Sequence, residues 1–76
     1  MPVSEVAVNR FLREPECRNV TGLSRSQRWR LEKEDRFPSR VQLSERAFGW
    51  VEDEVLAWCA DRVRERDRSA KRLDQH

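Results

Sequence analysis

Apolar residues recur at helical spacing in the last part of the chain. The stripe covers a little under half of a helical wheel and consists of Val51, Val55, Leu56, Trp58, Cys59 and Val63. Three acids, Glu52–Glu54, stand where they favour a helix start. The pattern predicts a long closing helix whose stripe forms the main wall of the core, with Trp50 and Trp58 as core residues. Beyond Val63 the charges are mixed, so we expect the helix to fray into a solvated tail.

A different pattern precedes this helix. Val41–Leu43 and Ala47–Trp50 are short runs in which apolar and polar residues alternate, and the polar segment Ser44–Arg46 joins them. Alternation across a short polar connection is typical of a β-hairpin.

Two short helices with a turn between them are predicted upstream. Pro15 between two acids indicates a helix from about Glu14 to Thr21. Gly22 can end it in a left-handed turn, and Ser24 is a good N-cap for a second helix, Arg25 to about Glu34. The residue before Pro38 is pushed out of the helical region, which ends that helix. These elements predict a small α+β domain with a helix-turn-helix and a hairpin as a candidate wing.

The chain length allows one domain. Residues 1–10 lack strong caps, so we expect a flexible N-terminal arm with a short extended piece around Val6–Val8. Residues 11–66 form the expected domain, in which Phe11 and Leu12 are the first apolar anchor. Residues 67–76 form the expected flexible charged tail.

Composition excludes several classes of protein. Of 76 residues, 39% are charged, and charges interrupt every apolar run well before membrane-spanning length, so we expect a soluble, cytoplasmic protein. His76 is the sole histidine and the two cysteines lie far apart, so neither a zinc site nor a catalytic set with a histidine can be assembled. We therefore expect no enzyme, metal or cofactor. Cys17 and Cys59 are expected to be buried free thiols, with a disulfide between them as the alternative.

Positive charge gathers in the middle of the chain. Residues 18–46 carry eight basic and four acidic groups, a net +4, whereas the segments on either side each carry a net −1. Such asymmetry indicates a surface that faces a polyanion, although basic stretches are also common on ordinary solvated faces.

The second helix carries the candidate DNA contacts. Arg25 and Arg30 suit guanine, Gln27 suits adenine, and Ser24 and Ser26 suit phosphate. Arg28 lies beside Leu31 on the wheel, so its stem is expected to cover the edge of the core while its guanidinium reaches outward. Trp29 points away from Leu31 and either packs against a strand or lies over the DNA backbone. The hairpin adds Arg40, Gln42 and Arg46, which either contact DNA or are ordinary hairpin surface.

Several of these segments form a recognisable set. They are Thr21–Ser26 (T-G-L-S-R-S), Trp29–Leu31, Arg36–Pro38 (R-F-P), and Gly49–Trp50 followed by Glu54–Val55 and Ala57–Trp58. From about Phe11 to Arg62 the chain resembles the AlpA family of small phage and prophage DNA-binding regulators, which are related in fold to excisionases and MerR-type winged helices. The resemblance implies a recognition helix in the major groove, with contacts from Ser24, Arg25, Ser26, Gln27 and Arg30, and the segment Arg40–Arg46 as the wing. This chain departs from the family pattern at Arg28, usually aliphatic, and at Asp35, usually glycine.

The predicted function is sequence-specific binding of double-stranded DNA in transcriptional control of phage or integrative-element genes. One alternative is an excisionase that bends attachment-site DNA for an integrase; RNA polymerase and integrase are thus the candidate protein partners. A protein-interaction adaptor is the second alternative. Without a long heptad pattern, we expect a monomer in solution that can assemble cooperatively on DNA.

Overall fold

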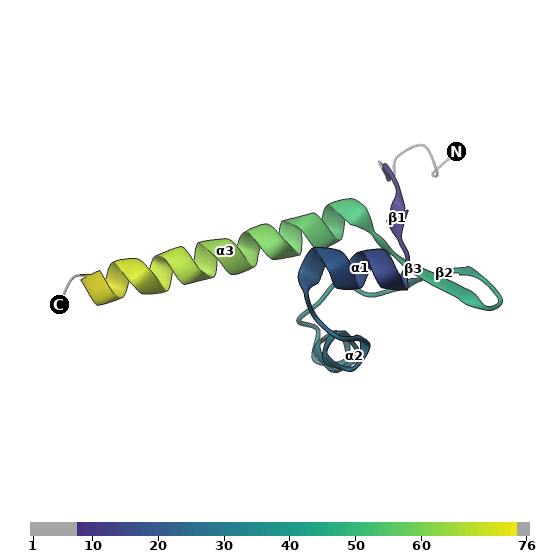
Figure 1. The fold of residues 1–76 in the computed structure, drawn as a ribbon, viewed down its shortest axis with the longest axis horizontal. Helices are drawn as coiled ribbons and strands as arrows, with labels where there is room; N and C mark the ends of the chain where they lie inside the picture. Colours follow the sequence, from purple (N-terminus) through teal and green to yellow (C-terminus); the bar gives the residue numbers. More distant parts are fainter. Residues whose placement is uncertain (1–7, 75–76) are drawn as a thin grey trace.

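The computed structural model describes residues 8–74, and the side chains of residues 8–70 (Figure 1). In chain order its elements are β1 (Phe11–Leu12), α1 (Glu14–Thr21), α2 (Arg25–Lys33), β2 (Val41–Ser44), β3 (Ala47–Val51) and α3 (Glu52–Asp74). The predicted small α+β fold with a winged helix-turn-helix is confirmed.

The turn between α1 and α2 depends on one glycine and one cap. Gly22 ends α1 with φ +74°, and its N–H donates to the carbonyl of Arg18 at 2.7 Å. A residue with a Cβ atom is strained at this φ. Ser24 then caps α2, because its hydroxyl accepts a hydrogen bond from the N–H of Gln27 at 3.2 Å. Together these contacts fix the direction in which α2 leaves the turn.

The end of α2 is closed by a left-handed residue that is not glycine. Asp35 has φ +58°, and its N–H donates to the carbonyl of Glu32 at 3.0 Å. The following N–H, from Arg36, donates to the carbonyl of Leu31 at 2.8 Å. Aspartate tolerates this conformation better than most residues, so it can stand where the family usually has glycine.

The sheet contains one strand more than the predicted hairpin. Its strand order is β1-β3-β2, all neighbours are antiparallel, and Leu12 pairs with Trp50. At Gly49 a Cβ atom would lie 3.1 Å from the carbonyl oxygen of Leu12, so the glycine permits β1 to approach. The third strand was not predicted, because a two-residue strand has no period of its own.

The core lies where the sheet, α1 and the first turns of α3 meet. Its buried apolar residues are Leu12, Cys17, Phe37, Trp50 and Val55, and Leu31, Trp58 and Cys59 pack against them. Trp50 and Trp58 are therefore core residues, as predicted. Both cysteines are free thiols. Trp58 also donates from Nε1 to the carbonyl of Arg36 at 2.7 Å, which attaches the segment after α2 to α3.

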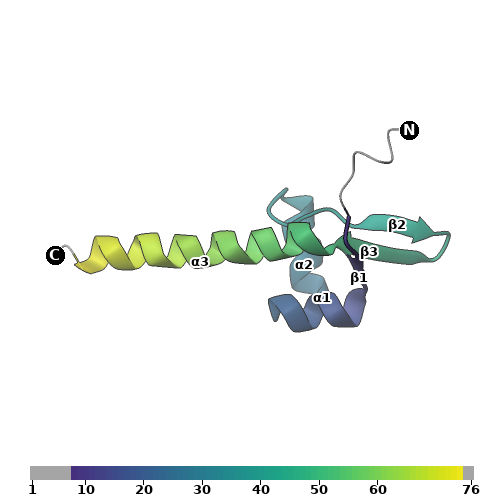
Figure 2. The ribbon, with the colours of Figure 1, turned by 90° about the horizontal axis from the view of Figure 1, so that it is seen from above.

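Helix α3 differs from the prediction in two ways. Its apolar stripe is wider than the body that covers it, because Leu56 and Val63 stay 48% and 47% exposed. The prediction that the helix frays after Val63 is wrong, since α3 continues to Asp74 and extends well beyond the body (Figure 2). Ion pairs one turn apart, Asp61 with Arg64 and Glu65 with Arg68, support this outer half.

The described end of the predicted N-terminal arm is attached to the domain. The Arg10 guanidinium lies 2.7 Å from the Glu52 carboxylate, and Asn9 donates to Asp53 at 3.2 Å. Most of the extended piece predicted around Val6–Val8 lies outside the described residues. Within the described part of the chain, no helix is long and apolar enough to cross a membrane.

Candidate nucleic-acid interface

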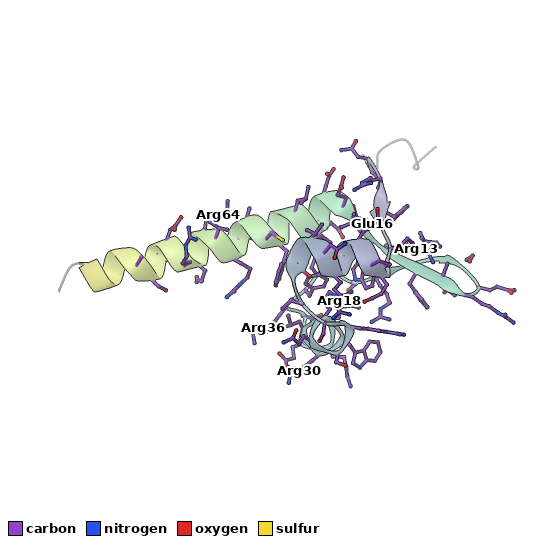
Figure 3. All side chains as sticks on the ribbon, viewed as in Figure 1. Arg13, Glu16, Arg18, Arg30, Arg36 and Arg64 are labelled. Carbon is purple, nitrogen blue, oxygen red and sulfur yellow. The ribbon has the colours of Figure 1, made fainter. Side chains whose placement is uncertain are left out.

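Helix α2 turns one side to the core and the opposite side to solvent. Arg28 is buried and Leu31 is half-buried on the inner side. Ser26, Arg30 and Lys33 are exposed, and their spacing of four and three residues places them on one outward face. We call these three residues the outward face of α2. In Figure 3, Arg30 lies on the side of α2 away from α1 and α3.

The exposed cations of this helix have no acidic partner among the described side chains. Among residues 8–70, no ion pair involves Arg25, Arg30 or Lys33, whereas Arg64, Arg66 and Arg68 on α3 are all paired. Two acids flank Lys33 in sequence: Glu32 has only 10% of its side chain exposed because it points toward the hairpin, and Glu34, which is 48% exposed, lies 3.5 Å from the Arg36 guanidinium. The outward face is therefore positive and has only weak local neutralisation.

Ser24 and Gln27, both predicted DNA contacts, already share a capping box. The Gln27 Oε1 atom accepts a hydrogen bond from the N–H of Ser24 at 2.8 Å, and the Ser24 hydroxyl accepts in return. The amide nitrogen of Gln27 is left for a further partner. Ser24 is half-buried, and its hydroxyl is committed to the helix start.

The prediction that the Arg28 guanidinium reaches outward is wrong. Arg28 is 1% exposed, its Nη2 pairs with the Glu14 carboxylate, and its Nε donates to the carbonyl of Leu23 at 3.3 Å. The guanidinium also lies over the Trp50 ring, 5.1 Å from the centroid. Arg28 thus joins α1, the turn and β3, and its burial removes it from the candidate DNA contacts.

The hairpin stands beside α2 as a wing. Gln42 is exposed on β2 and Arg46 is exposed in the turn between the strands. Arg40, the third predicted contact of the wing, instead precedes β2 and bridges to α2. Its Nε lies 3.2 Å from Glu32, and its guanidinium is 4.6 Å from the centroid of Trp29.

One carboxylate fixes the wing to α2. Glu32 accepts hydrogen bonds from Arg40 at 3.2 Å and from the indole Nε1 of Trp50 on β3 at 3.1 Å. Trp29 is 50% exposed and lies between Arg40 and Lys33, whose Nζ is 5.8 Å from the ring. Trp29 therefore packs beside the hairpin and also presents a face to solvent. This position is compatible with packing against the hairpin and with a place over the DNA backbone.

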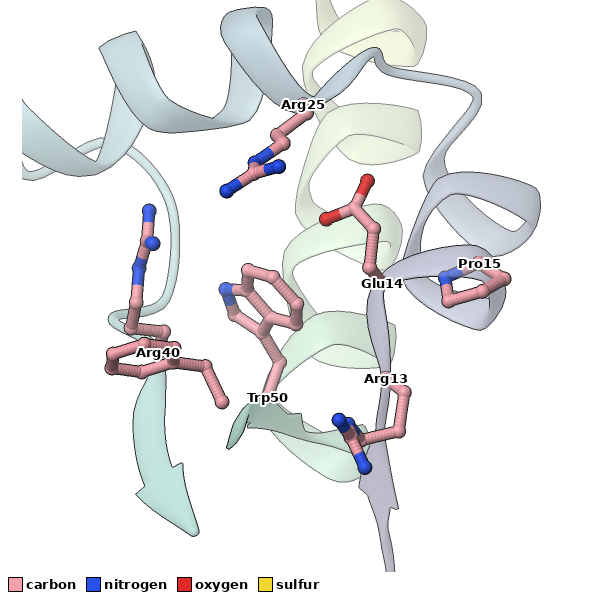
Figure 4. A pocket seen from close by; sticks show the side chains of 7 residues that line it. Arg13, Glu14, Pro15, Arg25, Arg40 and Trp50 are labelled. Carbon is pink, nitrogen blue, oxygen red and sulfur yellow. The ribbon is translucent and has the colours of Figure 1, made fainter. Parts of the chain in front are cut away.

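A hollow of about 200 Å³ lies between the starts of α1 and α2 and the hairpin (Figure 4). A second hollow, of about 400 Å³, shares Arg25 and Arg40 with it and adds Ser26 and Trp29. The first hollow is lined by Arg13, Glu14, Pro15, Arg25, Arg40, Phe48 and Trp50. Together the hollows form a concave strip along the hairpin side of α2.

Two surface cations of this region escaped the sequence prediction. Lys33 lies seven residues after Ser26, a spacing that already assigns both to one helix face. Arg13 lines the first hollow from the N-cap of α1, and no local pattern brings that position next to Arg25.

The two thiols are separate from this surface. Burial raises the pKa of Cys17 above its ordinary value, although the nearby Arg28 guanidinium acts in the opposite direction. Burial also raises the pKa of Cys59. Among residues 8–74, no group of three or more potential metal-ligating side chains lies close enough to hold a metal ion.

A capped second helix with a positive outward face, fixed beside a hairpin, defines a winged helix-turn-helix protein of the kind that binds nucleic acid. The chain belongs to the AlpA family, because the family model described as "Prophage CP4-57 regulatory protein (AlpA)" matches residues 10–63. It is also 40% identical over 68 residues to "Uncharacterized protein ORF88" of Enterobacteria phage P4. The aligned region covers 90% of this chain and 77% of the relative. No solved structure matches the chain. Family membership indicates a phage regulatory protein of a DNA-binding, non-enzymatic family.

Proposed function

We propose that the protein is a sequence-specific DNA-binding regulator of phage or integrative-element genes, acting in the cytoplasm. The observation that carries the proposal is the outward face of α2, where Arg30 and Lys33 lack acidic partners among residues 8–70. An α-helix such as α2 fits the major groove of duplex DNA. Family membership supports the same function.

In this proposal α2 lies in the major groove and the hairpin lies against the backbone or the minor groove. Arg30 makes a bidentate contact to guanine, and Ser26 and the free amide nitrogen of Gln27 add shorter contacts. Lys33, at the far end of α2, contacts phosphate. Gln42 and Arg46 contact the backbone from the wing.

The test of base reading is the substitution Arg30→Ala. A duplex selected in vitro for binding and a scrambled duplex of equal length are titrated with both proteins by fluorescence anisotropy. We expect Arg30→Ala to lose about 1–3 kcal/mol of discrimination between the duplexes, because the guanine contact is made only on the selected one. Equal discrimination by the variant and the wild type would contradict the assignment of Arg30 as a base reader.

The wing is tested by Arg46→Ala. We expect weaker binding to both duplexes by a similar factor, and a salt dependence whose slope falls by about 1, because a phosphate contact carries no sequence information. A loss confined to the selected duplex would instead make Arg46 a base reader.

Two further assays separate this function from its alternatives. Excision of an integrated element with and without the protein tests the excisionase role, in which the protein bends attachment-site DNA for an integrase. Transcription from the adjacent promoter tests recruitment or blocking of RNA polymerase. A protein-interaction adaptor would bind its partner with little dependence on salt and would not bind DNA.

A further inference from the structure

The hollow of about 200 Å³ brings together three arginines from three separate elements. Arg13 is the N-cap of α1, Arg25 is the first residue of α2, and Arg40 directly precedes β2. In Figure 4 the guanidinium groups of Arg25 and Arg40 lie above the Trp50 indole in the view, and that of Arg13 lies below it. We call this space the arginine hollow.

The charges around the arginine hollow are unbalanced. Glu14 is the only acid in its lining, and that carboxylate pairs with the buried Arg28. Arg40 is in turn paired with Glu32. Arg13 and Arg25 have no ion pair among residues 8–70, so two positive charges remain. Like charges that converge on a concavity repel one another, and a bound anion removes that cost.

The direction of Arg25 separates it from the outward face of α2. Successive residues of a helix are about 100° apart, and although both residues line the second hollow, Ser26 does not line the first. Arg25 lines both hollows, together with Arg40. It therefore lies on the hairpin side of α2, at the edge of the surface on which Arg30 and Lys33 lie.

We propose that the arginine hollow binds the DNA backbone, and that Arg25 and Arg13, on either side of Trp50, each contact a phosphate. Arg25 is then a backbone contact and not the guanine reader that the sequence predicts. A phosphodiester has one negative charge and acceptor oxygens that match the planar donor fork of arginine. The inference rests on the proposed function, since the duplex that α2 reads supplies the phosphate.

The experiment uses Arg13→Gln and Arg25→Gln, with Arg62→Gln as the matched control. Arg62 is an exposed arginine on α3 that has no ion pair among residues 8–70. Affinity for the selected and the scrambled duplex is measured from about 50 to 200 mM salt. Thermal unfolding followed by circular dichroism establishes that each variant is folded, which we expect because Arg13 and Arg25 are exposed.

Each hollow variant is expected to lose affinity for both duplexes by a similar factor. The slope of log K against log salt should become shallower by about 0.9 for each phosphate contact removed. Between about 50 and 200 mM salt, each such contact therefore accounts for about 3.5-fold of the affinity that the wild type loses. Arg62→Gln should bind both duplexes with the wild-type slope.

Three results would overturn the inference. If Arg25→Gln loses affinity for the selected duplex alone and keeps the wild-type slope, Arg25 reads a base. If both hollow variants bind as the wild type does, the hollow holds no phosphate, while the proposed function stands. If the wild type binds neither duplex, the proposed function fails and this inference fails with it.

A second measurement distinguishes backbone phosphate from free phosphate. The side-chain Nε–Hε resonances of Arg13 and Arg25 are followed by NMR during titration with duplex DNA and, separately, with inorganic phosphate. We expect both resonances to shift with the duplex and to shift weakly, at millimolar concentrations, with phosphate. Saturation by inorganic phosphate with no response to the duplex would identify a small-anion site and contradict the inference.

Discussion

Arginines on the outer half of α3 and arginines on α2 share a residue type but differ in their surroundings. Arg64 and Arg68 pair with acids three residues earlier on the same helix, and Arg66 pairs with Asp67. Arg25 and Arg30 have no such partner among residues 8–70. The first group supports and solvates a helix, whereas the second keeps its donors available for a polyanion.

Arg28 forms a third class, because it is buried in the body. It has a single acidic partner, Glu14, and one of its nitrogens, Nη1, has no hydrogen-bond partner within the described residues. Sequence position alone does not separate these classes, since Arg28 lies between Arg25 and Arg30. The difference comes from which helix face each residue occupies and from what packs on that face.

The largest expected effect is on the buried arginine. Glu14→Gln leaves the charge of Arg28 without its carboxylate, so we expect the free energy of unfolding to fall by about 2 kcal/mol, less than for a fully buried pair because 40% of the Glu14 side chain is exposed. Urea titration followed by circular dichroism measures it. The matched control is Glu34→Gln, an exposed acid beside Arg36, which should cost less than about 0.5 kcal/mol.

The double variant Glu14→Gln with Arg28→Leu sharpens the same point. Removing both charges leaves no buried ion, so most of the lost stability should return. If Glu14→Gln alone were as stable as the wild type, Arg28 would be no different from the solvated arginines of α3.

The next effect is the pH dependence that the buried Cys17 thiol gives to the free energy of unfolding. Burial raises the pKa of Cys17 in the folded state, so the unfolded chain loses its thiol proton first as pH rises. Stability is fully present below the unfolded pKa and falls above it, up to the folded pKa, by at most about 1.4 kcal/mol per pH unit. The chain contains no tyrosine to titrate in the same range.

Urea titrations between about pH 7 and pH 10, on either side of the ordinary cysteine pKa, measure this loss. Cys17→Ala is the control: it should be less stable at neutral pH, because a buried side chain is trimmed, and should lose less stability as the pH rises. An equal alkaline loss in this variant would contradict the role of Cys17.

A smaller effect is expected at the end of α2. Asp35→Gly should raise the free energy of unfolding by about 0.5 kcal/mol, because glycine adopts the positive φ of this position without strain. Asp35→Ala should lower it by about 1 kcal/mol. Thermal unfolding of the two variants measures both changes in stability. If Asp35→Ala were more stable than the wild type, the positive φ of residue 35 would not determine the stability of this helix end.

The smallest effect is expected on the outer half of α3. Arg64→Ala and Arg68→Ala should each change stability by less than about 0.5 kcal/mol, because both ion pairs are exposed. Their affinity for duplex DNA should equal that of the wild type in the anisotropy titration. A loss of affinity similar to that of Arg30→Ala would remove the distinction between paired and unpaired arginines.

Local signals in the sequence were enough to predict most of the fold. Gly22 and Ser24 mark the turn between α1 and α2 because backbone conformation and capping depend on neighbouring residues. The hairpin follows from alternation in the same way. Strand β1 depends on the pairing of Leu12 with Trp50, which lie far apart in the chain, and so no local pattern reveals it.

Two further differences have physical causes of the same kind. The outer half of α3 buries little, but arginine, glutamate and alanine favour helix, and the ion pairs add to that preference. Arg28 was expected to reach solvent because a helical wheel of α2 includes only residues of that helix. It cannot show that Glu14 on α1 pairs with Arg28. Four residues of α2 that were predicted to contact DNA are exposed, as such contacts require: Arg25, Ser26, Gln27 and Arg30.

The carboxylate of Glu32 has a consequence for protein engineering. Because it holds both Arg40 and Trp50, the angle between helix and hairpin is set by residues that the outward face does not include. If α2 reads bases as proposed, a library randomised at Ser26 and Arg30 would therefore sample new target sequences on an unchanged scaffold. Small winged domains with reprogrammed specificity are the expected product of such a selection.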